Sequence, residues 1–160
     1  MSQEVRVRLK SVRFEVEASL FSEEEGDGLR AVSGEFESEP EVIEINTLGV
    51  LALSGGRVAV SYEETEATGM DGSSTAVSFM VDQPGVVTMT REGAVSTALV
   101  FEKGKRHHCL YNTPFMPFEV CVHTLKVDNR LSKEKILELD YVIEIRGARA
   151  ERTKFRMELL

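Results

Sequence analysis

Two short patterns of metal-ligating residue types frame one corner of the chain. His107-x-Cys109 precedes this corner and Cys121-x-His123 follows it. A hairpin centred on Phe115 would place Cys109 opposite Cys121, and it would place the two histidines opposite each other. Two thiolates and two imidazoles form a ligand set that Zn²⁺ accepts in a tetrahedral site. The spacing therefore raises a zinc site as one hypothesis for this corner.

The same four side chains also have a simpler interpretation. Adjacent strands of a flat hairpin project their side chains roughly in parallel, whereas a metal site needs ligands that converge on one point. Cysteine packs as a small apolar residue inside proteins. A Cys–His nucleophile pair would need an orienting third group, and the sequence offers none nearby. Packing is the favoured interpretation, and the sequence indicates no metal and no cofactor.

The elements that position this corner are predicted to be short strands joined by tight turns. Turn-forming residues recur at strand-length intervals. They are Ser54-Gly55-Gly56, Asp71-Gly72, Pro84-Gly85, Glu92-Gly93, Lys103-Gly104, Asp128-Asn129 and Arg146-Gly147. Such a rhythm is typical of an antiparallel meander.

Between the turns, apolar and polar residues alternate with a period of two, which is the pattern of a strand with one buried face. The clearest case is 137–145, and the last segment, 154–159, repeats the pattern and is expected to pair with it. The best helix candidate is 132–139, but continued alternation favours a strand with a lead-in turn. We predict an all-β protein of about eight to ten strands, either a closed barrel or a sandwich. Closure is favoured because it removes exposed edges.

The first strand changes parity part of the way along. Its apolar residues fall on odd positions over 5–9 and on even positions over 12–20. A β-bulge near Lys10 and Ser11 would absorb the extra residue and keep both apolar rows on one face. This arrangement would place Arg13 on the solvent face.

Length and composition indicate an ordinary globular protein. A chain of 160 residues can bury its own core, and we expect a single domain over 1–160. Hydrophobic residues make up 42% and charged residues 29%, which argues against a wholly disordered chain. Residues 22–40 carry most of their charge as glutamate and aspartate, so we predict an acidic loop insertion there.

Charge and the first residues limit the expected partners and compartment. The formal net charge of -8 repels phosphate backbones, so nucleic-acid binding is not expected. No apolar run reaches the length of a membrane span, so membrane insertion is not expected either. Residues 1–10 alternate like a strand and lack the apolar block of a signal peptide. We therefore expect a cytoplasmic protein with reduced cysteines.

An ordered series of residues carries a family resemblance. The series is Thr47-x-Gly49, Tyr62-Glu63-Glu64, Arg91-x-Gly93, Phe101, Tyr111-x-Thr113-Pro114-Phe115, Thr124 and Tyr141. It resembles the YwiB-like proteins, an uncharacterised bacterial family, from about residue 41 to residue 160. The resemblance implies a calycin-like, lipocalin-like β-barrel and no established reaction.

Four polar residues are candidates for a binding site inside such a barrel. An antiparallel barrel either fills its interior with side chains or keeps a cup for a small ligand. Tyr62, Glu64, Arg91 and Tyr141 share the apolar faces of their strands. We hypothesise that they point into or close one end of the barrel and orient a small apolar or amphipathic ligand. In the alternative, they satisfy one another and plug the barrel, because a buried charge needs a partner.

Three classes of function follow from these patterns. A small-ligand binder is favoured. A protein-interaction or regulatory module with a filled barrel is the alternative, and Phe115, Met116 and Phe118 would be its exposed apolar group. A homodimer is left open. An enzyme of unknown reaction is least favoured, because acid–base catalysis needs a matched pair of groups in a concave site.

Overall fold

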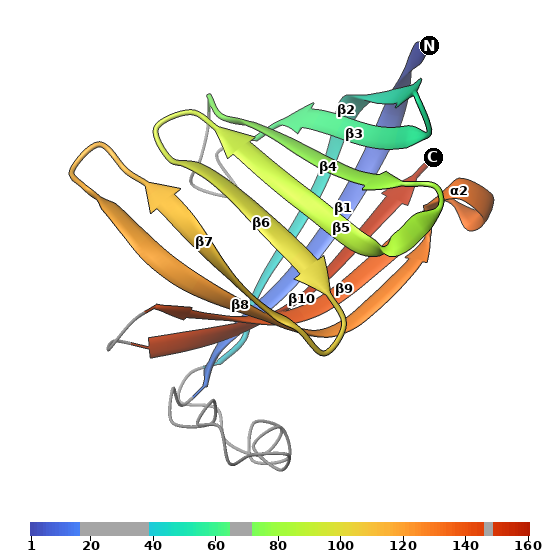
Figure 1. The fold of residues 1–160 in the computed structure, drawn as a ribbon. Helices are drawn as coiled ribbons and strands as arrows, with labels where there is room; N and C mark the ends of the chain where they lie inside the picture. Colours follow the sequence, from blue (N-terminus) through green and yellow to red (C-terminus); the bar gives the residue numbers. More distant parts are fainter. Residues whose placement is uncertain (17–38, 65–71, 146–148) are drawn as a thin grey trace.

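The computed structural model of the 160-residue chain describes residues 1–16, 39–64, 72–145 and 149–160. These residues form ten β-strands and one short helix (Figure 1). The elements are β1 (Ser2–Val16), β2 (Glu41–Ser54), β3 (Arg57–Glu63), β4 (Ser74–Met80), β5 (Gln83–Glu92), β6 (Ser96–Glu102), β7 (Arg106–Asn112), β8 (Pro117–Arg130), α2 (Leu131–Glu134), β9 (Ile136–Ile145) and β10 (Arg149–Leu159).

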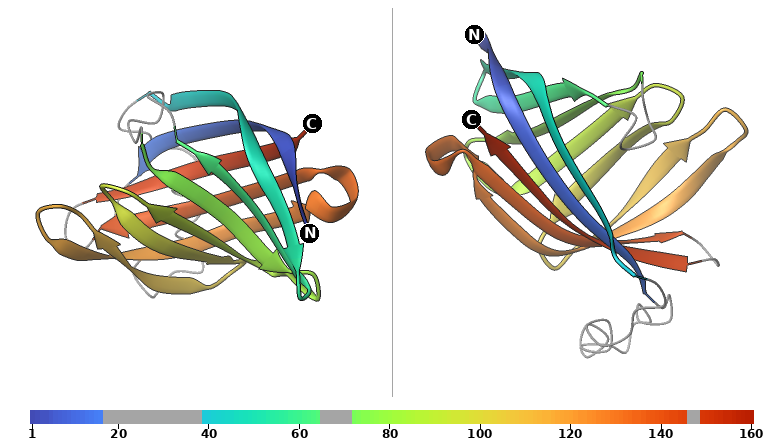
Figure 2. Two further views of the ribbon diagram at one scale, coloured as in Figure 1. Left: turned by 90° about the horizontal axis from the view of Figure 1, so that it is seen from above. Right: turned by 180° about the vertical axis from the view of Figure 1, so that it is seen from behind.

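The strands close into a single antiparallel barrel. Each strand pairs with the next along the chain, and β10 pairs with β1 to complete the wall (Figures 1 and 2). Closure leaves neither β1 nor β10 as an open edge, which is the advantage expected from the sequence. The predicted all-β meandering barrel is confirmed, and its ten strands are the upper end of the predicted range.

The segment that competed as a helix is mainly a strand. α2 has four residues and ends at Lys135, whose φ of 65° is left-handed. β9 then runs from Ile136 to Ile145 and pairs with β10, as the alternation predicts. Leu131 of α2 is 2% exposed and belongs to the main hydrophobic core. The short helix therefore contributes an apolar side chain to one end of the barrel.

The barrel interior is filled at the end that carries α2. Its inward side chains there are apolar and buried, and they include Val5, Val58, Phe79, Leu131, Leu137 and Leu159. Eight strands give an interior that side chains just fill, so ten strands leave a wider lumen. Large apolar residues occupy this extra width near α2. At the opposite end the inward residues are more polar, and that end holds the candidate site.

The predicted bulge in the first strand is absent, and that prediction is wrong. β1 keeps a continuous register with β10 from Val7 to Val16 and with β2 from Ser2 to Arg13. Side chains along β1 therefore alternate without interruption. Ser11 and Arg13 face the lumen with Leu9, whereas the even-numbered apolar row lies on the outer face of the barrel.

That outer row is buried by a second hydrophobic cluster. Phe14 and Val16 pack with Val142 of β9 and Ala150 of β10, and all four are at most 6% exposed. The guanidinium of Arg152 also lies 5.9 Å from the centre of the Phe14 ring. A change in sequence parity can therefore mark a second apolar surface outside the barrel. It need not mark an irregularity in the strand.

Two sequence expectations concern other parts of the chain. The predicted acidic loop at 22–40 lies outside the described residues, apart from residues 39 and 40. Within the described ranges, no helix is long and apolar enough to cross a membrane.

Candidate functional site

A cavity of about 200 Å³ lies at one end of the barrel, within the lumen. Its lining comes from the middle and last residues of β1, β3, β5, β7 and β9, from Glu64 after β3, and from the first and middle residues of β2, β6, β8 and β10. Most of the wall is aliphatic or aromatic, including Leu9, Ile43, Ile45, Leu99, Ile143 and Phe155. The arrangement is a concave pocket with a mainly aliphatic and aromatic wall and several polar side chains, and small molecules commonly bind in such pockets.

A buried ion pair forms one part of the cavity wall. Arg91 Nη2 lies 3.4 Å from Glu64 Oε2, and the two side chains are 12% and 2% exposed. Thr75 Oγ1 donates to the same carboxylate oxygen at 2.5 Å and accepts a hydrogen bond from Arg91 Nε at 3.2 Å. Burial of a charge requires such partners. Three strands therefore contribute to one connected polar group: Thr75 comes from β4, Arg91 from β5, and Glu64 directly follows β3.

Two tyrosines add phenolic hydroxyl groups to the cavity. Tyr62 and Tyr141 are each 6% exposed. Burial raises the pKa of Tyr62, and the negative charge of Glu64 raises it further, while Arg91 opposes both effects. Burial also raises the pKa of Tyr141 to about 12, with Arg91 again acting in the opposite direction. Both phenols therefore stay protonated at neutral pH and can donate hydrogen bonds.

A second arginine lies on the wall where the cavity is more exposed. Arg13 donates to Glu41, and the two side chains are 40% and 61% exposed. Desolvation lowers the pKa of Arg13, but the hydrogen bond to Glu41 and the charge of Glu151 outweigh it and raise the pKa overall. Glu151 also lines the cavity. This part of the wall is polar and solvated, in contrast to the buried pair of Arg91 and Glu64.

Aromatic contacts hold the cavity wall together across strands. Tyr111 and Phe118 are direct partners in the β7–β8 ladder, and their stacked rings are 5.4 Å apart. The rings of Phe101 and Tyr141 are 4.5 Å apart and tilted by 48°. Such pairs contribute about 0.5–1.5 kcal/mol beyond their buried area. The contact with Phe101 also restricts the position of the Tyr141 ring.

The structure brings all four sequence-predicted residues to the same cavity. Tyr62, Glu64, Arg91 and Tyr141 line it, each on an apolar face as the alternation predicts. Arg13, Tyr111 and Glu151 are among the lining residues that sequence reasoning did not assign to the site, and Phe118 lines the cavity and is half-buried, so its assignment to the exposed apolar group is wrong. The signal for Arg13 was present, since an uninterrupted first strand places it on the same face as Leu9.

The predicted pairing of Cys109 with Cys121 and of His107 with His123 is wrong. Cys109 pairs with Val120 and His107 pairs with Val122, so the hairpin is centred on the Pro114–Phe115 bond. A shift of one residue in register reverses the face of every side chain on one strand. Cys109 is consequently buried, whereas Cys121 lies on the other face and is half-buried.

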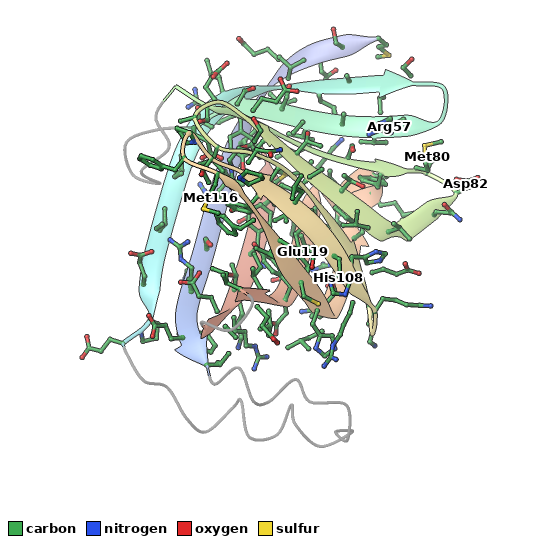
Figure 3. All side chains as sticks on the ribbon, turned by 60° about the vertical axis from the view of Figure 1, so that its left-hand side comes forward. Arg57, Met80, Asp82, His108, Met116 and Glu119 are labelled. Atoms are coloured by element: carbon green, nitrogen blue, oxygen red, sulfur yellow. The ribbon has the colours of Figure 1, made fainter. Side chains whose placement is uncertain are left out.

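The histidines of this corner are likewise divided between different partners. His107 Nε2 lies 3.4 Å from Glu102, and His108 Nδ1 lies 3.8 Å from Glu119. Figure 3 shows His108 and Glu119 side by side on neighbouring strands. Burial lowers the pKa of His123, with the charge of Arg106 acting in the same direction. Among the described residues, no group of three or more His, Cys, Asp or Glu side chains could hold a metal ion.

Two other residues of the series that carries the family resemblance, Gly93 and Thr124, have roles in packing. A Cβ at Gly93 would lie 2.2 Å from Ser73 Oγ, so only glycine fits there without a shift. Thr124 is fully buried, and its Oγ1 accepts a hydrogen bond from the backbone N–H of Glu102 at 3.3 Å. Thr124 therefore joins β8 to the end of β6. These residues shape the wall that carries the cavity.

Comparisons with known proteins agree with this architecture. Residues 31–157 match the family described as Domain of unknown function (DUF1934). The crystal structure of the ywiB protein from Bacillus subtilis matches with a TM-score of 0.66 and 20% sequence identity, covering 99% of this chain and 93% of that chain. No curated protein matches the sequence. The resemblance to YwiB-like proteins is confirmed, and the chain belongs to the DUF1934 family.

Proposed function

We propose that this protein is a calycin-like barrel that binds a small, mainly apolar molecule in its cavity. The single observation that carries the proposal is the combination of an apolar wall with a buried polar group at one end of a closed barrel. A barrel that used its interior only for stability would favour complete filling, as near α2. The two cysteines are unbonded thiols, which is consistent with the reducing cytoplasm.

The cavity volume limits the size of the ligand. The cavity holds about 200 Å³, which is below the usual range for drug-sized ligands of about 300–1,000 Å³. An apolar cavity of about 150 Å³ in another protein accommodates benzene. The ligand of this barrel is accordingly a small ring or a short chain, rather than a sterol or a nucleotide.

A pair of variants tests whether the cavity is the binding site. Ile43 lines the cavity, whereas Val42, its neighbour on β2, is 53% exposed on the outer face. Ile43→Trp places a large ring in the cavity, and Val42→Trp places the same ring outside. Propylbenzene is a suitable uncharged probe, and it stabilises the folded state if it binds there. We expect it to raise the melting temperature of the wild type and of Val42→Trp, but not of Ile43→Trp.

Native mass spectrometry of the purified protein provides a second measurement. A retained small molecule on the wild type, absent from Ile43→Trp, supports binding in the lumen. Absence of any retained molecule, together with no thermal response to propylbenzene, would refute the proposal. A folded Ile43→Trp variant that still responds to propylbenzene would place the binding site elsewhere.

A second candidate function is interaction through the turn between β7 and β8. Phe115 is 94% exposed and Met116 is 64% exposed, at the end of the barrel opposite Met80 and Asp82 (Figure 3). Thr113 Oγ1 donates to the Met116 carbonyl at 2.8 Å and accepts hydrogen bonds from both apolar residues' N–H groups. The turn therefore presents two apolar side chains in a fixed conformation. If a second copy associates through this turn, the wild type should be a dimer in sedimentation experiments. The double variant Phe115→Ser and Met116→Ser should then be a monomer.

A further inference from the structure

Both arginines that line the cavity already have partners of opposite charge. Among the described lining residues, Arg13, Glu64, Arg91 and Glu151 carry charge, and their formal charges cancel. Arg91 pairs with Glu64, and Arg13 pairs with Glu41 beside the cavity. Both cations of this set consequently have an acidic partner, and Glu151 also acts on Arg13 through its charge. A ligand anion would have to disrupt one of these pairs to gain a cation, and a ligand cation in the buried part of the cavity would have to disrupt the pair of Arg91 and Glu64.

Disruption of the inner pair is especially unfavourable. Glu64 is only 2% exposed, and it accepts hydrogen bonds from both Thr75 and Arg91. A ligand carboxylate that bound Arg91 would either leave Glu64 without its cation or bring two carboxylates together. A ligand ammonium group that bound Glu64 would strand the guanidinium in the same way. Removing one partner of a buried ion pair is costly because the other charge remains desolvated.

The neutral hydroxyl groups of the wall have remaining hydrogen-bonding capacity. Thr75 is the direct ladder partner of Tyr62, and Thr153 is the direct ladder partner of Tyr141. A phenol has one donor and two acceptor lone pairs, so one threonine partner does not saturate it. A ligand hydroxyl or carbonyl group can bind such a phenol without moving a charge. The two tyrosines are therefore the best partners for the polar part of a ligand.

We propose that the cavity selects an uncharged amphipathic molecule of about eight to ten non-hydrogen atoms, whose hydroxyl or carbonyl group binds Tyr62 and Tyr141. The aliphatic wall contacts its apolar body. This inference rests on the proposed function and adds the charge and the size of the ligand. It also assigns the buried pair of Arg91 and Glu64 a role in rejecting ionised analogues of the same shape.

Matched ligands of one skeleton test this selectivity. Titration calorimetry at neutral pH would compare 1-octanol with octanoate and with octylammonium. A second, aromatic skeleton would compare 4-ethylphenol with 4-ethylbenzoate. For at least one skeleton, we expect the uncharged ligand to bind about tenfold or more tightly than its ionised analogue, because the analogue must disturb a buried pair.

A variant that neutralises only Glu64 makes the test sharper. Glu64→Gln keeps the shape of the side chain but leaves Arg91 without its carboxylate, so we expect octanoate to gain affinity relative to 1-octanol. Glu63→Gln removes the same formal charge from the adjacent exposed residue, and we expect it to keep the wild-type preference. If Glu64→Gln does not fold, the ratio measured for the wild type decides the question.

The outcomes separate this inference from the proposed function. Equal or tighter binding of the ionised ligands by the wild type overturns the inference and leaves ligand binding intact. A folded Glu64→Gln variant with unchanged preference also overturns the role given to the pair. Failure of all five ligands and of propylbenzene to bind would overturn the inference and the proposed function together.

Discussion

Gly49 of β2 and Tyr62 of β3 are direct partners in the wall that carries the cavity, and the two strands approach closely there. A Cβ at Gly49 would lie 2.6 Å from the carbonyl oxygen of Ser61 and 3.0 Å from Val7 Cγ2. A backbone carbonyl cannot rotate away like a flexible side chain. Glycine at this position therefore sets the spacing of the strand that holds Tyr62.

Gly49→Ala should consequently destabilise the protein. We expect a loss of about 1–3 kcal/mol in the free energy of unfolding, which is the usual cost of overpacking a core. Urea denaturation measures this loss. Gly85→Ala is the matched control, because a Cβ at Gly85 meets nothing within 4 Å. Equal stability of the two variants would contradict the close approach at Gly49.

The pair of Arg91 and Glu64 should respond strongly to removal of one partner. Arg91→Met leaves a carboxylate that is 2% exposed without its cation, so we expect a loss of about 3–5 kcal/mol. Combining Arg91→Met with Glu64→Leu removes both charges and should recover much of that loss. Chemical denaturation of Arg91→Met, Glu64→Leu and the double variant gives the interaction free energy between the two side chains.

An exposed pair provides the comparison. Lys10 lies 3.9 Å from Glu44, and these side chains are 52% and 66% exposed. Lys10→Met should change stability by no more than about 1 kcal/mol, because solvent screens such pairs. If Arg91→Met proved as mild as Lys10→Met, the buried pair would not have the energetic importance assigned to it.

Tyr141 should make stability depend on pH in alkaline solution. Burial raises its pKa to about 12, from 10.0 for an exposed phenol. Between these values the unfolded chain loses the phenolic proton while the folded protein retains it. The unfolded state then binds fewer protons, so the free energy of unfolding decreases as pH rises. The contribution is fully present below pH 10 and is lost as pH approaches 12.

Replacement by phenylalanine isolates this contribution. In the wild type, ionisation of Tyr141 in the unfolded chain should lower the free energy of unfolding by about 1.4 kcal/mol per pH unit in this range. Tyr141→Phe should lack this contribution, because the phenylalanine side chain cannot ionise. Any effect of removing the hydroxyl group itself shifts the whole profile and leaves the slope comparison unaffected. Parallel profiles for the wild type and Tyr141→Phe would show that the phenol does not titrate as its burial requires.

Periodicity alone predicted part of the wall. Inward-facing residues on β3, β5 and β9 could be identified because each strand keeps one parity between its turns. This places Tyr62, Arg91 and Tyr141 in the lumen without any knowledge of contacts. Periodicity does not reveal which inward-facing residues lie at the same height in the barrel. That depends on strand order and stagger, which became known only from the closed topology.

Two of the wrong predictions have a common physical origin. At β1, the row that contains Val12 and Phe14 was assigned to the core, although it packs on the outer face against Val142. At the β7–β8 turn, the hairpin centre was placed on Phe115, half a residue from its true position. A strand pattern specifies alternation but not which face is inside. A hairpin centre displaced by half a residue shifts the register by one residue. Each wrong assignment therefore reversed the face of a whole row of side chains.

The corrected register makes a direct prediction for the two cysteines. Cys109 is buried on the inner face, whereas Cys121 is half-buried on the outer face. Side chains that point to opposite faces of a wall cannot reach disulfide geometry without backbone movement. Mild oxidation of the native protein should therefore yield no intramolecular disulfide, as measured by intact mass before and after reduction.

Thiol labelling should distinguish the same two residues. Burial raises the pKa of both thiols, and Cys109 is also less accessible, so iodoacetamide should react slowly with Cys121 and more slowly with Cys109. Cys109→Ser and Cys121→Ser assign each labelling phase, and denatured protein shows the rate without protection. An intramolecular disulfide in the native protein would place both cysteines on one face and restore the register centred on Phe115. Faster labelling of Cys109 than of Cys121 would contradict the burial of Cys109 on the inner face.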